Sequence, residues 1–296
     1  MTLPARPPIG GRTRLAGVIG WPVSHSRSPL LQNEWLRRSG IDGAYVPLPV
    51  APGDLEAALR GLRAAGFAGV NATLPHKEEA FRLSDIRTEA AERCGSANTL
   101  TFLPDGRLHA DSTDGRGFLD SLRAEGIDPA AGPVLLLGAG GAARAIAAAL
   151  QQAGAAVHVA NRSPARAEAL AAALPDRANP IRTLGWHDRE AALAGMALLV
   201  NTSPVGMAHA AGSPCGLQRA GPALAVSDIV YVPRITPLLA DAQARGLRTV
   251  EGLGMLLHQG RLGFARWFGV DPAVDPALFD LVRADLDGPT WAAGSR

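Results

Sequence analysis

The sequence predicts an α/β protein of two domains, and three observations lead to this prediction. Strand and helix signals alternate along most of the chain, which is typical of sheets covered by helices. The length of 296 residues favours two domains of ordinary size. The composition changes near Gly132, where a short apolar run enters a glycine-rich turn. We therefore expect two α/β domains that meet in the sequence near this point.

Composition excludes several classes of protein. The chain is 47% hydrophobic and 19% charged with a net charge of +2, values typical of a globular protein and too nearly neutral to indicate nucleic-acid binding. Glycines and Arg144 interrupt the most apolar window, so we expect no membrane span. Two distant cysteines and scattered histidines indicate neither a disulfide framework nor a metal site. Because the N-terminus lacks the apolar run of a signal peptide, we expect a cytoplasmic protein.

The first part of the chain predicts strands at 15–20, 44–50 and 69–73, each followed by a helix. Ser28 is expected to cap the first helix, with Pro29 at its first position and an end near Ser39. The second helix is expected over 53–65. The third follows the stretch Asn71-Ala72-Thr73-Leu74-Pro75-His76-Lys77. Since ligands of open α/β sheets bind where strands end, this stretch is a candidate site.

Lys77 is the only lysine among 29 Lys and Arg residues. The excess of Arg, together with abundant Ala, Gly and Pro, indicates a genome that uses Arg wherever either cation serves. An ammonium, unlike a guanidinium, is compact and can give up its proton near working pH when its surroundings lower its pKa. Lys77 therefore marks a position where arginine does not serve. The alternative is that one lysine survived by chance.

Two strands at 98–102 and 108–112 predict a hairpin around Pro104-Asp105-Gly106. Thr113-Asp114-Gly115 follows the hairpin, and Asp114 by itself is typical of a turn.

A short apolar strand at 134–137 enters Gly138-Ala139-Gly140-Gly141-Ala142-Ala143, which opens an Ala-rich helix ending near Gln152. This G-x-G-x-x-A pattern between strand and helix predicts dinucleotide binding. Glycines permit the tight turn and the close approach of a pyrophosphate, whose charge the helix N-terminus attracts. The alternative is an ordinary glycine-rich turn.

The end of the next strand, at 156–160, indicates which dinucleotide binds. A site for NAD usually has an acidic residue there, about 20 residues after the first glycine. This chain instead has Asn161, Arg162 and Ser163, with Arg166 shortly after. Guanidinium groups pair with a 2′-phosphate, whereas a carboxylate repels it. We therefore expect NADP, the alternative being two solvated arginines beside a helix capped by Ser163.

The remaining chain predicts parallel strands at 197–201 and 225–230, a helix at 236–245 and a last strand at 248–250. A final helix at 253–268 is amphipathic. Its apolar face is formed by Leu253, Leu257, Gly260, Phe264 and Trp267. Gln259 lies at the edge of this face, where its amide needs a hydrogen-bond partner from the protein or from a substrate hydroxyl.

An ordered set of motifs over nearly the whole chain resembles the shikimate dehydrogenase family. The motifs are Ser-His-Ser-Arg-Ser-Pro at 24–29, the stretch at 71–77, Ala-Asn-Thr-Leu at 97–100, Ser-Thr-Asp-Gly at 112–115, Gly-Ala-Gly-Gly-Ala at 138–142, Asn-Arg-Ser at 161–163, Asp-Ile-Val-Tyr-Val-Pro at 228–233, Thr-Pro-Leu-Leu at 236–239 and Gly-Leu-Gly-Met-Leu-Leu-His-Gln at 252–259. The resemblance implies NADPH-dependent reduction of 3-dehydroshikimate to shikimate.

The resemblance also implies an architecture and a set of site residues. A substrate domain over 1–115, a Rossmann-like NADP-binding domain over 116–250 and helices over 251–296 that return to the first domain would enclose a cleft. Lys77 and Asp114 would be the catalytic pair. The substrate would bind to Ser26, Ser28, Asn71, Thr73, Lys77, Asn98, Asp114, Tyr231 and Gln259. NADP would bind to Gly138, Ala139, Gly140, Gly141, Ala142, Asn161, Arg162, Arg166 and Gly252.

Departures from the family pattern are mild, with Ser112 in place of Asn, Ala72 in place of Val and Ser163 in place of Thr. They leave open a paralogue acting on quinate or aminoshikimate, although Arg162 argues against the NAD-linked quinate enzymes. A non-catalytic NADP(H)-sensing protein is a second alternative, but such a protein would be expected to lose Lys77 or Asp114. The implied partner is a small-molecule substrate, and the chain would act as a monomer or a homodimer.

Overall fold

The computed structural model describes residues 8–207 and 210–288. The chain divides into two compact units. The first contains the described residues up to Thr113 together with Gln259–Leu278, and the second contains Asp114–His258 together with the described residues from Phe279 onward. The domain boundaries at 115 and 250 expected from the sequence stay a prediction, and residues 1–7 and 289–296 of those domains lie outside the described residues.

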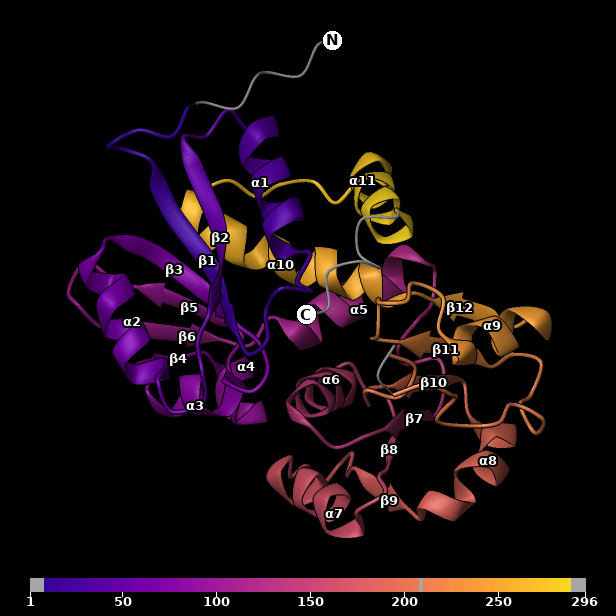
Figure 1. Ribbon diagram of the computed structural model, residues 1–296. Coiled ribbons are helices and arrows are strands. Elements are labelled where there is room, and N and C mark those ends of the chain that lie inside the picture. Colours follow the sequence, from indigo (N-terminus) through magenta and orange to yellow (C-terminus); the bar gives the residue numbers. More distant parts are fainter. Residues whose placement is uncertain (1–7, 208–209, 289–296) are drawn as a thin grey trace. The chain divides into compact units, whose positions relative to one another are not determined.

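The first unit is built on a six-stranded mixed sheet (Figure 1). Its strands are β1 (Arg14–Gly20), β2 (Gly43–Pro49), β3 (Phe67–Ala72), β4 (Ile86–Arg87), β5 (Thr99–Phe102) and β6 (Leu108–Asp111). Their spatial order is β2-β1-β3-β5-β6-β4. Strands β1, β2 and β3 are parallel, and β5 runs antiparallel to both β3 and β6. The predicted hairpin and the three predicted N-terminal strands are thus confirmed.

The first unit also contains helices α1 (Ser28–Arg38), α2 (Leu55–Ala64), α3 (Lys77–Arg82) and α4 (Glu89–Cys94). Leu55 and Leu59 of α2 pack into one core cluster with Ile19 of β1 and Val70 of β3. The prediction that Ser28 caps α1 is wrong. The cap position is Arg27, without a side-chain capping bond, because α1 already begins at Ser28, whose side chain is buried.

Helix α10 (Gly252–Phe268) joins the first unit from Gln259 onward. Its predicted apolar face is confirmed, since Leu253, Leu257, Phe264 and Trp267 are at most 2% exposed. Within the first unit, the Trp35 ring of α1 and the Phe264 ring form a T-shaped pair with centroids 5.6 Å apart. This aromatic contact holds the returning helix against α1.

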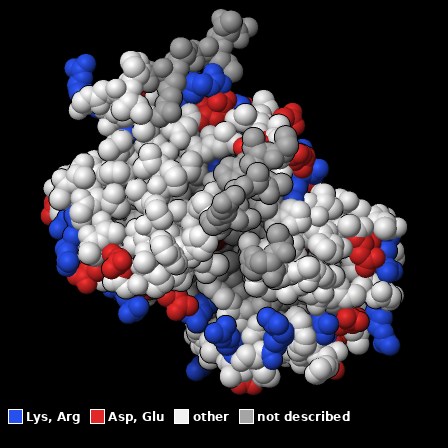
Figure 2. Space-filling model, viewed as in Figure 1, with Lys and Arg blue, Asp and Glu red and all other residues white. Residues whose placement is uncertain are grey.

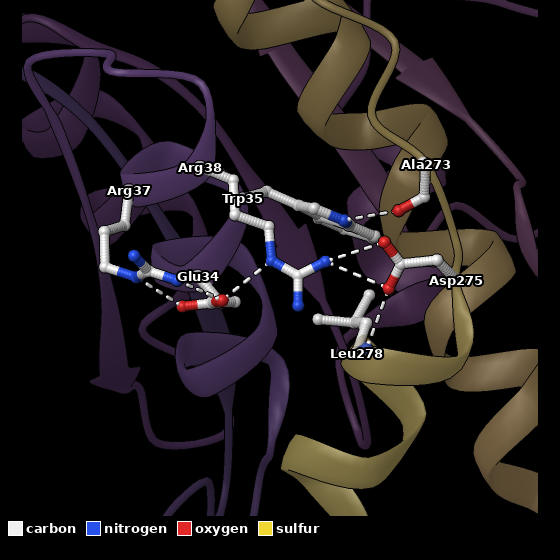
Figure 3. Close-up of polar contacts among 7 residues, drawn as sticks. All are labelled: Glu34, Trp35, Arg37, Arg38, Ala273, Asp275 and Leu278. Atoms are coloured by element: carbon white, nitrogen blue, oxygen red, sulfur yellow. Dashed lines mark hydrogen bonds and ion pairs between the residues drawn. The ribbon is translucent and has the colours of Figure 1, made fainter. Parts of the chain in front are cut away.

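Polar contacts hold the segment after α10 against α1 (Figure 3). The indole Nε1 of Trp35 donates to the Ala273 carbonyl at 2.9 Å. Arg38 donates to both carboxylate oxygens of Asp275 at 2.9 Å and to Glu34 at 2.7 Å. Asp275 also accepts a bond from the Leu278 amide at 2.9 Å. Residues more than 230 positions apart in the sequence are therefore joined within one unit.

The second unit is built on a six-stranded parallel sheet. Its strands are β7 (Val134–Leu137), β8 (Val157–Ala160), β9 (Arg182–Leu184), β10 (Leu198–Asn201), β11 (Ala225–Asp228) and β12 (Arg248–Val250). The spatial order β9-β8-β7-β10-β11-β12 is the Rossmann order 3-2-1-4-5-6. The direction of strand succession therefore reverses between β7 and β10, where such sheets bind ligands at the carboxyl ends of their strands.

Helices cover both faces of this second sheet. The helices of the unit are α5 (Asp114–Ala124), α6 (Gly141–Gln152), α7 (Pro164–Ala173), α8 (Arg189–Ala192), α9 (Pro237–Ala244), the start of α10 as far as His258, and most of α11 (Pro276–Asp287), with short 3₁₀ turns at Trp186–Asp188 and Leu193–Gly195. Val134 and Leu136 of β7 pack into the core cluster of α5, α6 and α7, whereas Leu135 and Leu137 pack into the cluster of α9. This burial on both faces explains why the β7 sequence is entirely apolar.

Several elements have no counterpart in the sequence-based expectation, among them β4, β9, α4, α5, α8 and α11. The strand expected to reach residue 230 ends at Asp228, whose side chain accepts bonds from two other side chains and a loop amide. Among the described residues, none of the helices has the length and apolar character needed to span a membrane.

Candidate active site

The carboxyl ends of β1 and β3 lie side by side in the first unit. The two strands are parallel, with Ile19 opposite Ala72. The loop after β3 folds back onto β1, where the Thr73 amide donates to the Ile19 carbonyl at 2.9 Å. The Trp21 amide donates to the Leu74 carbonyl at 3.1 Å. The serine-containing loop and the lysine-containing stretch are thus neighbours at one edge of the sheet.

Lys77 is the first residue of α3 and is half-buried. The preceding residue, His76, is 1% exposed, and its ring Nε2 lies 2.7 Å from the Val50 carbonyl oxygen. The His76 amide donates to the Thr73 carbonyl at 2.9 Å, and the Lys77 carbonyl accepts from the Ala97 amide at 2.9 Å. Bonds on both sides therefore hold the backbone that carries the only lysine.

The two expected serines lie where the loop after β1 enters α1. The Ser26 hydroxyl oxygen accepts a bond from the Ser28 amide at 3.3 Å, and the Ser26 amide donates to the Val23 carbonyl at 3.0 Å. Arg27 is buried and donates to the His25 carbonyl at 2.8 Å. The loop is therefore held by its own backbone and side chains.

The two expected amides Asn98 and Gln259 meet each other, although they lie 161 positions apart. Asn98 Nδ2 donates to Gln259 Oε1 at 3.1 Å and to Thr113 Oγ1 at 2.9 Å. The Thr113 amide donates to Asn98 Oδ1 at 2.7 Å. The partner that the sequence left open for Gln259 is thus a protein amide. Thr113, which sequence reasoning passed over, fixes the orientation of the Asn98 side chain.

Seven of the nine expected substrate residues belong to the first unit, namely Ser26, Ser28, Asn71, Thr73, Lys77, Asn98 and Gln259. The other two belong to the second unit. Asp114 is the first residue of α5 and is 5% exposed, so the turn suggested by its local sequence is instead a helix start. Tyr231 follows β11 and is half-buried. That these two join the other seven stays a prediction.

The dinucleotide fingerprint has the geometry that its glycines require. Gly138 has φ of +116°, and a Cβ there would lie 2.7 Å from Thr202 Oγ1, so no other residue fits without strain. Gly140 is the N-cap of the 12-residue helix α6, and a Cβ on it would meet no heavy atom within 4 Å. The amide end of α6 is thus open to an anion such as a pyrophosphate. Ala139, Gly141 and Ala142 complete the turn.

The end of β8 presents the expected arginines to solvent. Arg162 and Arg166 are exposed, and Asn161 Nδ2 donates to the Ser163 carbonyl at 2.9 Å. Ser163 is the N-cap of α7 with Pro164 next, as predicted, although its side chain makes no capping bond. On the face in view, Figure 2 shows basic and acidic side chains interspersed, with several basic ones near α7. The exposed guanidinium groups after β8 are therefore suited to bind a phosphorylated ribose.

Gly252 begins α10, shortly after β12. A Cβ on Gly252 would lie 2.5 Å from the Ile229 carbonyl oxygen, so the residue permits a close backbone approach to the loop that follows β11. This packing accounts for the glycine, and its contact with a cofactor stays a prediction.

Sequence reasoning missed a buried carboxylate between the loops that follow β10 and β11. Asp228 is fully buried and accepts bonds from Asn201 Nδ2 at 3.0 Å and Thr236 Oγ1 at 2.8 Å. The Val230 amide also donates to it at 3.0 Å. Burial raises the pKa of Asp228 to about 6, although these three donors oppose the shift. The signal in the sequence was a polar residue at the end of each of two apolar strands.

Comparisons with known proteins agree with these features. A model described as the shikimate dehydrogenase substrate binding domain matches residues 18–100. Models described as shikimate / quinate 5-dehydrogenase and as the shikimate 5′-dehydrogenase C-terminal domain match residues 125–201 and 252–278.

Relatives and solved structures cover almost the whole chain. A shikimate dehydrogenase (NADP+) of Acidiphilium cryptum is 58% identical over 280 residues, which are 95% of this chain and 99% of that protein. A shikimate dehydrogenase crystallised with NADP+ has a TM-score of 0.89 and 31% identity, covering 96% of this chain and 100% of that one. The shikimate 5-dehydrogenase of Thermus thermophilus, crystallised with NADP(H) and shikimate, has a TM-score of 0.82 and 38% identity, covering 92% and 99%.

Proposed function

The chain belongs to the shikimate dehydrogenase family, and on this premise we propose that Lys77 and Asp114 are the catalytic pair of its reaction. That reaction is the reversible NADPH-dependent reduction of 3-dehydroshikimate to shikimate, an oxidation–reduction at a secondary alcohol in aromatic amino acid biosynthesis. The observation that carries the proposal is the placement of the only lysine at the start of α3, beside the carboxyl ends of β1 and β3.

NADP fits the second unit. The open N-terminus of α6 and the turn at Gly138 would receive the pyrophosphate, and exposed Arg162 and Arg166 would pair with the 2′-phosphate. Residues proposed to hold the cofactor are Gly138, Ala139, Gly140, Gly141, Ala142, Asn161, Arg162, Arg166 and Gly252. When bound, the reduced cofactor supplies a hydride to the carbonyl carbon of the substrate.

Lys77 supplies the proton in this proposal. Negative charge develops on the carbonyl oxygen as the carbon is reduced, and an ammonium group stabilises this charge and then gives the oxygen its proton. In the reverse direction, the neutral amine takes the proton from the hydroxyl. A guanidinium offers charge but holds its proton too tightly for this transfer. Asp114 is proposed to orient Lys77 and to accept a bond from a substrate hydroxyl.

The first unit offers the substrate a set of hydrogen-bonding groups. Ser26 and Ser28 would bind the carboxylate and hydroxyls together with Asn71, Thr73, Asn98, Tyr231 and Gln259. The hydroxyl and amide groups of this set suit a polyhydroxylated carboxylic acid, because each substrate hydroxyl needs both a donor and an acceptor.

The test is reduction of NADP or NAD by purified protein with shikimate or quinate, for the wild type and Lys77→Arg. We expect turnover with shikimate and NADP, and a kcat about 10²- to 10⁴-fold lower in the variant, the usual contribution of general acid–base catalysis. Arg60→Lys makes the reverse exchange at an exposed position of the same unit and should leave kcat unchanged. Wild-type kinetics in Lys77→Arg would contradict the assignment.

The other outcomes of this experiment identify the alternatives. A preference for quinate would indicate the paralogue, and a preference for NAD would remove the role given to Arg162. Tight NADP binding without any turnover would indicate a sensing protein. The proposal also includes action in the cytoplasm without nucleic acid, as a monomer or a homodimer, and sedimentation velocity would distinguish the last two.

A further inference from the structure

Tyr45 of β2 lies in no sequence motif, yet it contacts two of the proposed substrate residues. Its side chain is 2% exposed, and its hydroxyl donates to Asn71 Oδ1 at 2.6 Å. Burial raises the pKa of Tyr45 well above its usual value, while a hydrogen bond from Ser28 opposes the shift. The tyrosine therefore stays protonated at working pH and joins the start of α1 to the end of β3.

The bonds of Asn71 determine which way its amide faces. The amide nitrogen lies 2.9 Å from the Asn98 carbonyl oxygen, which can only accept, and 3.2 Å from Thr99 Oγ1. Both amide hydrogens are therefore used within the protein, and Oδ1 is turned toward Tyr45. Of the hydrogen-bonding groups of the Asn71 side chain, only the second lone pair of Oδ1 is left for a ligand. Without the Tyr45 hydroxyl, the buried Oδ1 would lose its protein donor.

The same chain of bonds continues to Gln259. Thr99 Oγ1 lies 3.1 Å from Thr113 Oγ1, and Thr113 holds the Asn98 amide that donates to Gln259. The residues of this neutral network are Tyr45, Asn71, Asn98, Thr99, Thr113 and Gln259, each at most 8% exposed. A buried network of this kind is cooperative, so a missing member disturbs its neighbours.

We propose that Tyr45 is a positioning residue for the substrate, whose hydroxyl holds Ser28 and Asn71 in the orientation that the substrate's carboxylate and hydroxyl groups require. This inference rests on the proposed function, which makes Ser28 and Asn71 substrate residues. Tyr45 itself touches neither the substrate nor the cofactor in this role.

Tyr45→Phe tests the proposal because it removes only the hydroxyl. The ring and its tilted contact with Trp267, at a centroid distance of 6.1 Å, are retained. We expect the KM for shikimate to rise about tenfold, the usual order for an unpaired buried group. The KM for NADP should stay within about twofold, since the second unit is untouched. The pH at which kcat is half-maximal should not move, because the lysine is unchanged.

Ser84→Ala is the matched control. The Ser84 hydroxyl is also buried in the first unit, but it donates only to the Ala80 carbonyl at 2.6 Å. Its loss should leave both KM values unchanged. An unchanged KM for shikimate in Tyr45→Phe, or an equal rise in the control, would overturn the proposal. A Tyr45→Phe protein that fails to fold would also overturn it, because the hydroxyl would then serve the fold.

A double-mutant cycle tests whether Tyr45 acts through Asn71. Asn71→Ala should raise the KM for shikimate much less in the Tyr45→Phe background than in the wild type, because Asn71 would already have lost the orientation that the Tyr45 hydroxyl gives it. Equal rises in both backgrounds would show that Tyr45 acts by another route. Failure of the proposed function would appear differently, as a wild-type protein that turns over quinate or nothing. If the wild type prefers quinate, the same double-mutant cycle is measured with quinate as the substrate. A wild-type protein without any turnover would overturn both the proposed function and the role of Tyr45.

Discussion

Each unit holds a buried polar network that includes strand residues, and the two networks differ in charge. The neutral network of the first unit consists of one phenol, two threonines and three amides. The network of the second unit centres on a carboxyl group, Asp228, which accepts from Asn201, Val230 and Thr236. The first network joins side chains of β2, β3 and β5 to α10, whereas the second joins the ends of β10 and β11 to the start of α9.

The two networks respond differently to pH. Hydroxyls and amides do not titrate at working pH, so the first network keeps its hydrogen bonds over a wide pH range. A buried carboxyl group takes up a proton near pH 6, and the second network therefore depends on pH. The groups expected to hold the cofactor differ from both networks, because they are backbone amides and exposed guanidinium groups. Salt screens the interaction of exposed guanidinium groups with a phosphate.

The largest effect on stability is expected at Asp228. Burial raises its pKa to about 6 from an ordinary 3.8, so between these values the folded chain keeps a proton that the unfolded chain has lost. The free energy of unfolding therefore falls as the pH rises from about 4 to about 6, by up to about 3 kcal/mol from this group. Asp228→Asn should remove this decline, as measured by urea unfolding across the range.

Tyr45→Phe is the control for this comparison, because it alters the neutral network. Its unfolding free energy should follow the wild-type pH dependence between about pH 4 and 6, with a constant offset. If Asp228→Asn and the wild type gave parallel curves, the buried carboxyl group would not be the source of the decline, and the contrast between the two networks would fail.

The next largest effect is expected at Arg162. Removing a guanidinium that pairs with the 2′-phosphate costs about 1.5–3 kcal/mol, which corresponds to a roughly 10- to 150-fold weaker affinity for NADP in Arg162→Ala. The affinity for NAD should not change. Fluorescence titration at two salt concentrations measures both, and Arg177→Ala, at another arginine of the same unit, serves as control. Equal losses for NADP and NAD would contradict a 2′-phosphate contact.

The smallest effect is expected at Arg38, in the charged cluster of Figure 3. Its side chain is 21% exposed and bonds both Glu34 and Asp275. Ion pairs of this kind contribute at most about 1 kcal/mol, and Arg37 would remain on Glu34. Arg38→Gln should lower the free energy of unfolding by about 0.5–1 kcal/mol at low salt, and by less at high salt. A salt-independent loss would show that packing, not charge, holds Asp275.

Local patterns in the sequence predicted most strands of both sheets and the fingerprint at Gly138. They predicted these because strand burial and glycine turns leave their signal within a few residues. They misplaced the cap at Ser28, and the turn that the local sequence offered as an alternative for Asp114 is a helix start in the structure. Both side chains are buried, a property that no short stretch of sequence shows.

Residues that orient the side chains of other site residues could not be identified from the sequence. Tyr45 looked like any aromatic residue of a buried strand, and Thr113 like a spacer before Asp114. Their importance arises from bonds to Asn71 and Asn98, which exist only because β2, β1, β3 and β5 lie in that order in one sheet. A sheet order is a long-range property, and no periodicity within a strand records it.

The α/β class, the family and the chemical types available at the site could be inferred from the amino-acid sequence alone. These follow from composition, periodicity and short motifs, including one lysine and no acid after β8. Which polar groups bond to each other, such as Asn98 with Gln259 and Asn201 with Asp228, depends on the tertiary fold. The physical reason is that a buried polar group takes the partner that strand order and helix packing bring within reach, however distant that partner is in the chain.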